Sequence, residues 1–274
     1  MVATMERAVV FPGQGSVGGE ITGAARRAVI DLLGDDEVPY QLSVFASSID
    51  LFYRLKDSGI TADVVAGHSL GEYAAAHAAG SLALSNGVWL VAERDRLMNE
   101  ASKENPGGMV AMIGADADEV ARAVEASDGA VVAANFNTPR QIVLSGREDA
   151  LEEITGGLRG RKFRLQVAGA FHSPLMSTAA VEMDRLLREA EFRDPDVPMI
   201  GATDGRILTT ADAVRDGLRN QMLSPVRWVS VVERLLDLGV REIFEAGEDG
   251  TLTRMLRDFK RKDVVGVRAG EALS

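Results

Sequence analysis

Gly67-His68-Ser69-Leu70-Gly71 is the stretch that decides the fold of this chain, and it fits the pattern G-x-S-x-G. The apolar run before it, residues 62–66, predicts a buried strand, and the alanine-rich residues 72–79 predict a helix. A serine on a sharp turn between a strand and a helix is typical of a nucleophile elbow. The alternative is a plain serine N-cap between two packing glycines, and the flanking pattern favours the elbow.

The composition narrows the class of protein. The chain has 274 residues, of which 26% are charged, and this is typical of a globular protein of one or two domains. A formal net charge of -11 argues against bulk attraction to nucleic acid or to an anionic membrane. The absence of cysteine excludes disulfides and a cysteine nucleophile. With no long apolar segment, we expect a cytoplasmic protein, and we expect a monomer.

Strands and helices alternate along most of the chain, which predicts a largely parallel sheet in an α/β fold. The first strand, residues 8–11, leads into a glycine-rich loop at residues 12–16. Sites in α/β proteins lie at the carboxyl ends of strands, so this loop is a candidate site element. It matches neither a Walker A loop nor a full G-x-G-x-x-G pattern, and a plain strand-to-helix turn is the alternative.

In the middle of the chain the expected order of strands and helices changes. Residues 103–108 read as a linker, and the expected order after them is strand, helix, two strands, helix and strand. This β-α-β-β-α-β order is the ferredoxin-like plan. We therefore predict a discontinuous catalytic domain of residues 1–104 and 168–274, with a small subdomain of residues 105–167 inserted in it.

A serine nucleophile needs a base, and only three histidines are available. His68 adjoins Ser69 on a sharp turn, so the two side chains should point apart, and His77 lies about 12 Å further along the helix. His172 remains, just outside a helix that Ser173 should cap, and the helix dipole should keep its imidazole neutral. No acid stands out as its partner, which leaves a backbone carbonyl as a candidate.

An oxyanion hole would complete this chemistry. Its first donor should be the backbone N–H that follows the nucleophile, which belongs to Leu70. A second donor must come from another loop at the same edge of the sheet, and the loop that holds Gln14 is the candidate.

Six stretches, taken together and in this order, resemble the malonyl-CoA:acyl-carrier-protein transacylases and the acyltransferase domains of polyketide synthases. The resemblance covers nearly the whole chain. It implies an α/β-hydrolase-like domain with a ferredoxin-like insert, which agrees with the strand order above. The six stretches are residues 11–16 (FPGQGS), 67–72 (GHSLGE), 94–98 (RDRLM), 135–146 (NFNTPRQIVLSG), 171–176 (FHSPLM) and 221–228 (QMLSPVRW).

The resemblance implies a role for each matching residue. Ser69 would carry the acyl group as an ester, and His172 would act as base and then as acid. The backbone carbonyl of Gln221 would orient that histidine. Arg94 would bind the free carboxylate of a malonyl group, for which a guanidinium fork is suited. From the residues alone, a surface salt bridge within the charged run around Arg94 is the alternative. Gln14 and Leu70 would donate their N–H groups to the oxyanion.

The resemblance also implies substrate and partners. Phe171, just before the histidine, goes with malonyl in the family, because its bulk leaves little room for an α-branch. We count His68 among the candidate substrate-binding residues as well. Malonyl-CoA and an acyl carrier protein bearing phosphopantetheine would be the substrates, with no metal and no resident cofactor. Carrier proteins are usually acidic, so basic clusters are candidates for docking: Arg159, Arg161, Lys162 and Arg164, or Arg254, Arg257, Lys260, Arg261 and Lys262.

Three departures from the family pattern concern the entrance and the acyl group. The chain reaches Tyr40 and Gln41 soon after Ser16, Asp95 replaces a glycine, and residues 247–250 replace a G-P-G. They keep one alternative open, a transferase that moves another acyl or aminoacyl unit between carriers. A thioesterase that uses the same Ser69 and His172 but admits water is a second alternative, and Arg94 and the missing acid partner argue against it. A non-catalytic carrier-binding protein is disfavoured, because no expected catalytic residue is missing.

Overall fold

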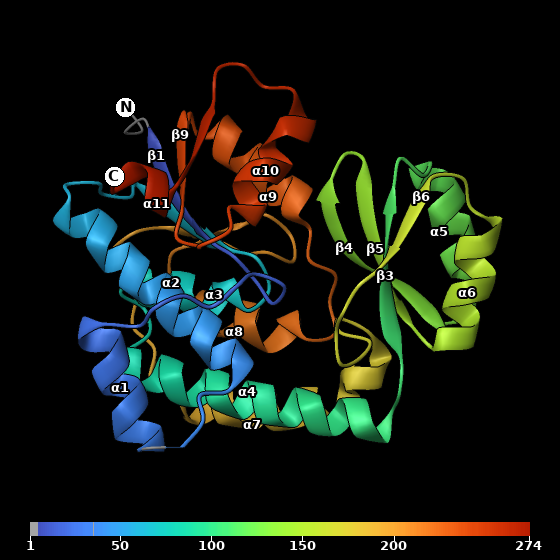
Figure 1. Ribbon diagram of the computed structural model, residues 1–274, viewed down its shortest axis with the longest axis horizontal. Coiled ribbons are helices and arrows are strands. Elements are labelled where there is room, and N and C mark those ends of the chain that lie inside the picture. Colours follow the sequence, from blue (N-terminus) through green and yellow to red (C-terminus); the bar gives the residue numbers. More distant parts are fainter. Residues whose placement is uncertain (1–4, 35) are drawn as a thin grey trace.

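A computed structural model describes residues 5–34 and 36–274 of the chain (Figure 1). Within those residues the strands form two separate sheets. One has six strands in the order β10-β9-β1-β2-β7-β8, and the other has four in the order β4-β5-β3-β6. The fold is therefore mixed α/β.

The six-stranded sheet is parallel except at one edge, as the alternation of strands and helices predicts. Only β8 runs antiparallel, against β7. β1 and β2 occupy the centre of the sheet and pair in register from Ala8 with Val64 to Phe11 with Gly67. The strands are β1 (Arg7–Phe11), β2 (Val64–Gly67), β7 (Met199–Ile200), β8 (Ile207–Leu208), β9 (Glu242–Glu245) and β10 (Val265–Arg268).

Helices cover both faces of this sheet. Side chains of a strand alternate between its faces, and those of β1 do so here. Val9 and Phe11 pack in the core under α2, whereas Ala8 and Val10 pack with Trp228 of α9 on the opposite face. Figure 1 shows α4 and α7 alongside one another on the first side. The helices are α1 (Gly23–Leu33), α2 (Tyr40–Asp57), α3 (Gly71–Ala78), α4 (Leu84–Glu104), α7 (Ser177–Glu189), α8 (Ala211–Gln221), α9 (Trp228–Asp237), α10 (Thr251–Met255) and α11 (Ala269–Ala272), with short 3-10 turns η1 (Pro174–Met176) and η2 (Leu256–Phe259).

The four-stranded sheet is antiparallel throughout and has helices on one face only (Figure 1). Val110, Leu144 and Leu151 belong to the core under its helices. Met109 and Val143 face the opposite way and join the core of the large sheet. The elements are β3 (Gly108–Ile113), α5 (Ala117–Ala126), β4 (Val131–Thr138), β5 (Gln141–Gly146), α6 (Glu148–Gly157) and β6 (Arg161–Arg164).

Several expected boundaries were wrong. The expected linker at residues 103–108 is shorter, because α4 continues to Glu104 and β3 begins at Gly108. Residues 135–140, which the sequence pattern predicts as the connection between β4 and β5, instead continue β4 as far as Thr138, so the connection to β5 is a hairpin turn of Pro139 and Arg140 alone. The helix expected after Ser173 begins as the 3-10 turn η1. None of the helices in the described ranges combines the length and apolar composition that a membrane span requires.

Candidate active site

The turn between β2 and α3 has the geometry of a nucleophile elbow. Ser69 adopts a φ of 52°, which is unusual for a residue with a side chain. Glycine is required at positions 67 and 71, on either side of Ser69, because other backbone atoms approach these two residues closely. A Cβ at Gly67 would lie 2.1 Å from the carbonyl carbon of Gly71, and a Cβ at Gly71 would lie 2.1 Å from the carbonyl oxygen of Phe11. The turn therefore presents the serine hydroxyl at the carboxyl end of a central strand.

Ser69 and His172 form a hydrogen-bonded pair. Ser69 Oγ lies 2.8 Å from Nε2 of His172, although the residues are 103 positions apart. Nδ1 of the histidine lies 3.0 Å from the carbonyl oxygen of Gln221 and 3.1 Å from that of Ser224. Carbonyl oxygens only accept, so Nδ1 carries the proton and Nε2 is free to accept from the serine hydroxyl. No carboxylate is needed to orient this ring.

The His172 imidazole is held neutral by its surroundings. Burial, and after it the positive charge of Arg94, together lower its pKa from 6.5 to about 4. Burial is thus the leading cause of the neutral state, rather than the helix N-terminus that the sequence indicates. That helix start is present, since the Ser173 hydroxyl accepts the backbone N–H of Leu175. His172 itself has a φ of 58°, so both members of the pair sit in left-handed backbone.

The Gln221 side chain connects the pair to a buried acid. Its Nε2 donates to the backbone carbonyl of Ser69 at 2.8 Å and to Oε2 of Glu72 at 2.6 Å. The other oxygen of Glu72 accepts the backbone N–H of Ala202 at 2.8 Å. Burial raises the pKa of Glu72 to about 7, against the opposing effect of these donors. Glu72 was missed as a site residue, because its partners lie about 130 positions or more along the chain and leave no local pattern.

Arg94 lies wholly inside the protein beside the nucleophile. Only 1% of it is exposed, and its Nη2 lies 3.3 Å from both Ser69 Oγ and Gln221 Oε1. Its Nη1 donates to Oε1 of Gln41. The expected alternative, a surface salt bridge, is wrong for Arg94 and describes Arg96 instead, which pairs with Glu93 and Glu100 on the surface.

The charge of Arg94 has no counter-ion in the parts of the chain that the structure describes. No carboxylate oxygen of those residues lies within 4.0 Å of its nitrogens, and its buried Nε has no hydrogen-bond partner there. Burial accordingly lowers its pKa. A buried cation without an anion is costly unless a ligand supplies the negative charge. The arrangement can therefore hold an anionic group next to the serine hydroxyl.

A cavity of about 240 Å³ opens over the pair, between the two sheets. Gln14 and Phe171 line it from the large-sheet side, together with Ser69 and His172. Met109 and other side chains of the small sheet form the opposite wall, and α10 contributes Leu252 and Met255. Leu70 is buried and directly precedes α3, whose first N–H groups, those of Gly71 and Glu72, donate to the carbonyl oxygens of His68 and Ser69. The cavity thus brings together residues from distant parts of the sequence around one hydroxyl.

Comparison with known proteins identifies the family. Residues 33–267 match the family model described as the acyl transferase domain. The chain belongs to this acyl transferase family. The match spans the serine, the histidine, Arg94 and Gln221.

Relatives of this acyl transferase agree in sequence and in structure. A malonyl CoA-acyl carrier protein transacylase of Bacillus subtilis is 35% identical over 81% of this chain and 72% of its own length. The crystal structure of the malonyl-CoA:ACP transacylase of Synechocystis superposes with a TM-score of 0.89 at 30% identity, covering 97% of this chain and 98% of its own. A malonyl-transacylase solved in complex with its type II polyketide acyl-carrier protein superposes with a TM-score of 0.87 at 29% identity. That match covers 96% of this chain and 95% of the other chain.

The other two histidines of the acyl transferase have structural contacts. His68 Nε2 lies 2.8 Å from Oδ1 of Asn137, and its ring packs edge-on against Trp228. Burial lowers its pKa, so it lines the cavity as a neutral group. His77 contacts the Tyr53 hydroxyl and the backbone carbonyl of Leu82, away from the serine. The elimination that left His172 therefore agrees with the geometry.

A metal would need a different arrangement of side chains. Over residues 5–34 and 36–274, no group of three or more His, Asp or Glu side chains is placed to hold a metal ion. The polar groups beside the nucleophile, namely the Ser69 hydroxyl, the neutral His172 imidazole and the Arg94 guanidinium, suit an acyl thioester instead.

Proposed function

We propose that this acyl transferase moves a malonyl group from coenzyme A to the phosphopantetheine thiol of an acyl carrier protein. The observation that carries the proposal is the buried Arg94 guanidinium, with Nη2 3.3 Å from the Ser69 hydroxyl and no carboxylate partner among the described residues. A bound malonyl carboxylate would supply the missing charge and would hold the neighbouring thioester carbonyl against the serine.

The first half of the exchange forms an ester on Ser69. His172 Nε2 accepts the hydroxyl proton as Oγ attacks the thioester carbonyl carbon, and a C–O bond forms. The developing oxyanion accepts from the backbone N–H groups of Gln14 and Leu70. The C–S bond then breaks, and coenzyme A leaves as a thiol with the proton that His172 held. Coenzyme A is a substrate here, and we propose no resident cofactor and no metal.

The second half reverses these roles. The phosphopantetheine thiol of the carrier gives its proton to His172 and attacks the ester carbonyl, so a C–S bond forms. The C–O bond to Ser69 breaks, and the serine recovers the proton from His172. The names of the relatives support this reaction, since they are malonyl transacylases and one was solved together with an acyl-carrier protein.

Two exposed basic clusters are candidates for receiving the acidic carrier. Both adjoin the cavity. The cluster of Arg159, Arg161, Lys162 and Arg164 is followed by Leu165 and Val167, which line the cavity. The cluster of Arg254, Arg257, Lys260, Arg261 and Lys262 lies next to the cavity residues of α10. Carrier docking at either cluster would bring the thiol to the same opening.

We also propose a finer description of the architecture. Residues 1–104 and 168–274 would form an α/β-hydrolase-like catalytic domain, and residues 105–167 a ferredoxin-like subdomain. Supporting this division, the four-stranded sheet uses elements from Gly108 to Arg164 only, in the order strand, helix, two strands, helix and strand. The cytoplasmic location and the monomeric state stay predictions.

Intact-protein mass spectrometry tests the proposal. The protein is mixed separately with malonyl-CoA, acetyl-CoA and methylmalonyl-CoA, and a carrier protein bearing phosphopantetheine is then added. We expect a malonyl adduct that moves to the carrier and is absent in Ser69→Ala. Arg94→Ala should lower malonyl loading by about 100-fold or more, because breaking a buried ion pair costs about 3–5 kcal/mol. Arg96→Ala, two positions away on the surface, is the matched control and should load normally.

The same experiment separates the alternatives. Rapid release of free malonate without carrier transfer would indicate a thioesterase, which the names of the relatives do not favour. An acetyl adduct as abundant as the malonyl adduct would contradict the role of Arg94. The absence of any adduct would indicate a different donor, such as an acyl unit already bound to a carrier.

A further inference from the structure

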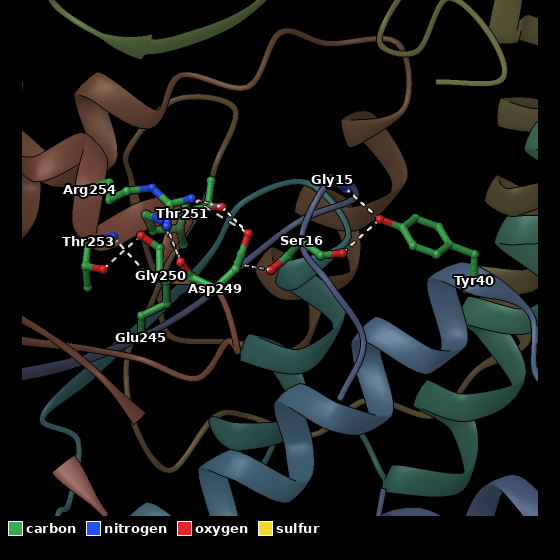
Figure 2. A network of polar contacts seen from close by, with 10 residues as sticks. Gly15, Ser16, Tyr40, Glu245, Asp249, Gly250, Thr251, Thr253 and Arg254 are labelled. Carbon is green, nitrogen blue, oxygen red and sulfur yellow. Dashed lines mark hydrogen bonds and ion pairs between the residues drawn. The ribbon is translucent and has the colours of Figure 1, made fainter. Parts of the chain in front are cut away.

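The loop that carries Gln14 is held from two sides by side chains that take no part in the proposed acyl transfer (Figure 2). From α2, the Tyr40 hydroxyl accepts the backbone N–H of Gly15 at 3.1 Å and donates to the carbonyl oxygen of Ser16 at 2.8 Å. From the other side, the Ser16 hydroxyl donates to Oδ1 of Asp249 at 2.5 Å. Two consecutive residues after Gln14 are thus fixed to separate elements of the fold.

Asp249 is itself firmly placed. Its second carboxylate oxygen accepts the hydroxyl of Thr251 at 2.7 Å, and its backbone carbonyl accepts from Arg254 (Figure 2). The stretch then enters α10, whose first N–H groups donate to the buried carboxylate of Glu245, 3.0 Å away for Leu252. Asp249 therefore anchors Ser16 to the same part of the chain that forms one wall of the cavity.

The residue before Gln14 is restrained as well. Gly13 packs so closely on the elbow that a Cβ there would lie 2.5 Å from the carbonyl oxygen of His68. The backbone is consequently fixed at Gly13, at Gly15 and at Ser16, with Gln14 between them. An oxyanion donor works only when it is held in place before the reaction, and a misplacement of about 1 Å can cost about 100-fold in rate.

We propose that Tyr40 and Asp249 are positioning residues that hold the backbone N–H of Gln14 in place for the oxyanion, an inference that rests on the proposed acyl transfer. Tyr40 reaches the loop from the first residue of α2, and Asp249 reaches it from the stretch just before α10. Neither side chain touches the substrate in this proposal, and both act through the loop.

The test compares Tyr40→Phe with Tyr53→Phe. Both tyrosines lie on α2, and the Tyr53 hydroxyl contacts His77 at 2.7 Å, outside the cavity. One readout is the single-turnover rate of Ser69 acylation at saturating malonyl-CoA. The other is the labelling rate with a fluorophosphonate, in which an O–P bond forms, a P–F bond breaks and fluoride leaves. This probe needs the oxyanion donors but no malonyl group.

We expect Tyr40→Phe to lower both rates by about five- to tenfold, with KM for malonyl-CoA changed by less than twofold. Asp249→Ala should do the same, and Ser16→Ala, which removes the same bond, serves if Asp249→Ala fails to fold. Tyr53→Phe should keep both rates within twofold. Wild-type labelling rates in both Tyr40→Phe and Ser16→Ala, or equal losses in Tyr53→Phe, would overturn the inference. Normal labelling of the wild type without malonyl loading would instead overturn the proposed function and leave this test intact.

Discussion

Gln221 donates its side-chain amide to the backbone carbonyl of Ser69 at 2.8 Å. The backbone carbonyl of the same glutamine accepts from Nδ1 of His172 at 3.0 Å. One residue at the end of α8 therefore fixes both the turn that carries the nucleophile and the ring that removes its proton. Its side chain also reaches Glu72 and Arg94, so Gln221 links the nucleophile, the base, the buried acid and the buried arginine.

The change Gln221→Ala separates these two roles. The backbone carbonyl stays, so His172 should keep its orientation, while the elbow and the buried Glu72 lose a donor. We expect acylation of Ser69 to slow about tenfold and the free energy of unfolding to fall by about 1–3 kcal/mol, the cost of an unsatisfied buried group. Single-turnover kinetics and urea unfolding measure these effects. Gln166→Ala, at an exposed position, is the control, and an unchanged acylation rate in Gln221→Ala would refute this role.

Because His172 is neutral, the rate at which Ser69 reacts should fall on acidification only at unusually low pH. We call this fall the acid limb of the pH–rate profile. A base must be unprotonated to accept a proton, and burial lowers the pKa of this imidazole to about 4. Fluorophosphonate labelling of Ser69 should therefore be flat from pH 8 to about 5.5 and should fall as the pH drops through about 4. The reagent itself carries no titrating group, so the limb reports the free enzyme. A midpoint near 6.5, the ordinary value for histidine, would show that burial is not decisive.

Binding of a malonyl group should move the acid limb of the pH–rate profile to a higher pH. The positive charge of Arg94 is one of the causes that lower the pKa of His172, and a bound carboxylate would offset it. The acid limb of single-turnover acylation by malonyl-CoA should consequently lie at a higher pH than the limb of fluorophosphonate labelling. Coincident limbs would mean that the carboxylate does not reach Arg94.

The sequence predicted those site residues that neighbouring residues in the chain point to, and it did not predict those that only distant contacts bring into the site. The elbow, the N-cap at Ser173 and the choice of His172 rest on neighbouring residues or on the scarcity of histidine, and the geometry agrees with them. Glu72 and Gln41 could not be found this way, since each contacts groups that are more than 50 positions away.

Arg94 shows that a local signal can also be overlooked. Its helix is buried at Leu90, Val91, Leu97 and Met98, and Arg94 falls on the same helical face at a spacing of three or four residues. Arg96 falls outside this stripe and is exposed. The apolar period therefore distinguishes an internal arginine from a surface one within a single charged run. The end of β4 has no comparable signal in the sequence, because tertiary contacts determine where strand pairing stops.

Glu72 predicts a pH dependence of stability. Its pKa is about 7 in the folded protein against an ordinary 4.5, so the folded state keeps a proton that the unfolded state loses between these values. The contribution of Glu72 to the free energy of unfolding should therefore fall as the pH rises from about 4.5 to 7 and should then level off. Glu72→Gln cannot ionise, and any hydrogen bond that the variant loses is lost at every pH. The variant therefore changes the free energy of unfolding by an amount that does not depend on pH, apart from the ionisation of Glu72 in the wild type.

The measurement is the difference in free energy of unfolding between wild type and Glu72→Gln, from urea titrations at several pH values. We expect the wild type to lose about 3 kcal/mol relative to the variant between pH 4.5 and 8, from about 1.4 kcal/mol for each pKa unit. The sign is diagnostic, because a salt-bridged carboxylate would give the opposite slope. A difference that does not vary with pH would show that Glu72 is ionised in the folded protein.

Phe171 should control discrimination against an α-methyl group. It is 5% exposed and lines the cavity next to His172. Replacement by leucine keeps an apolar side chain in the core but removes the far edge of the ring. A pocket distinguishes one methyl group by about 1–3 kcal/mol, so Phe171→Leu should narrow the preference for malonyl-CoA over methylmalonyl-CoA by about tenfold. Competition between the two thioesters for Ser69 gives this ratio directly.

The matched control for Phe171→Leu is Phe192→Leu. Phe192 is 7% exposed in the same hydrophobic core, but it does not line the cavity, and its ring lies under the guanidinium of Arg215. Both changes remove a similar volume and should lower stability to a similar degree. Only the change at Phe171 alters the space beside the serine, so only that variant should change the ratio. If both variants shift it equally, general loosening of the core sets the preference, and the ring at 171 has no specific part in it.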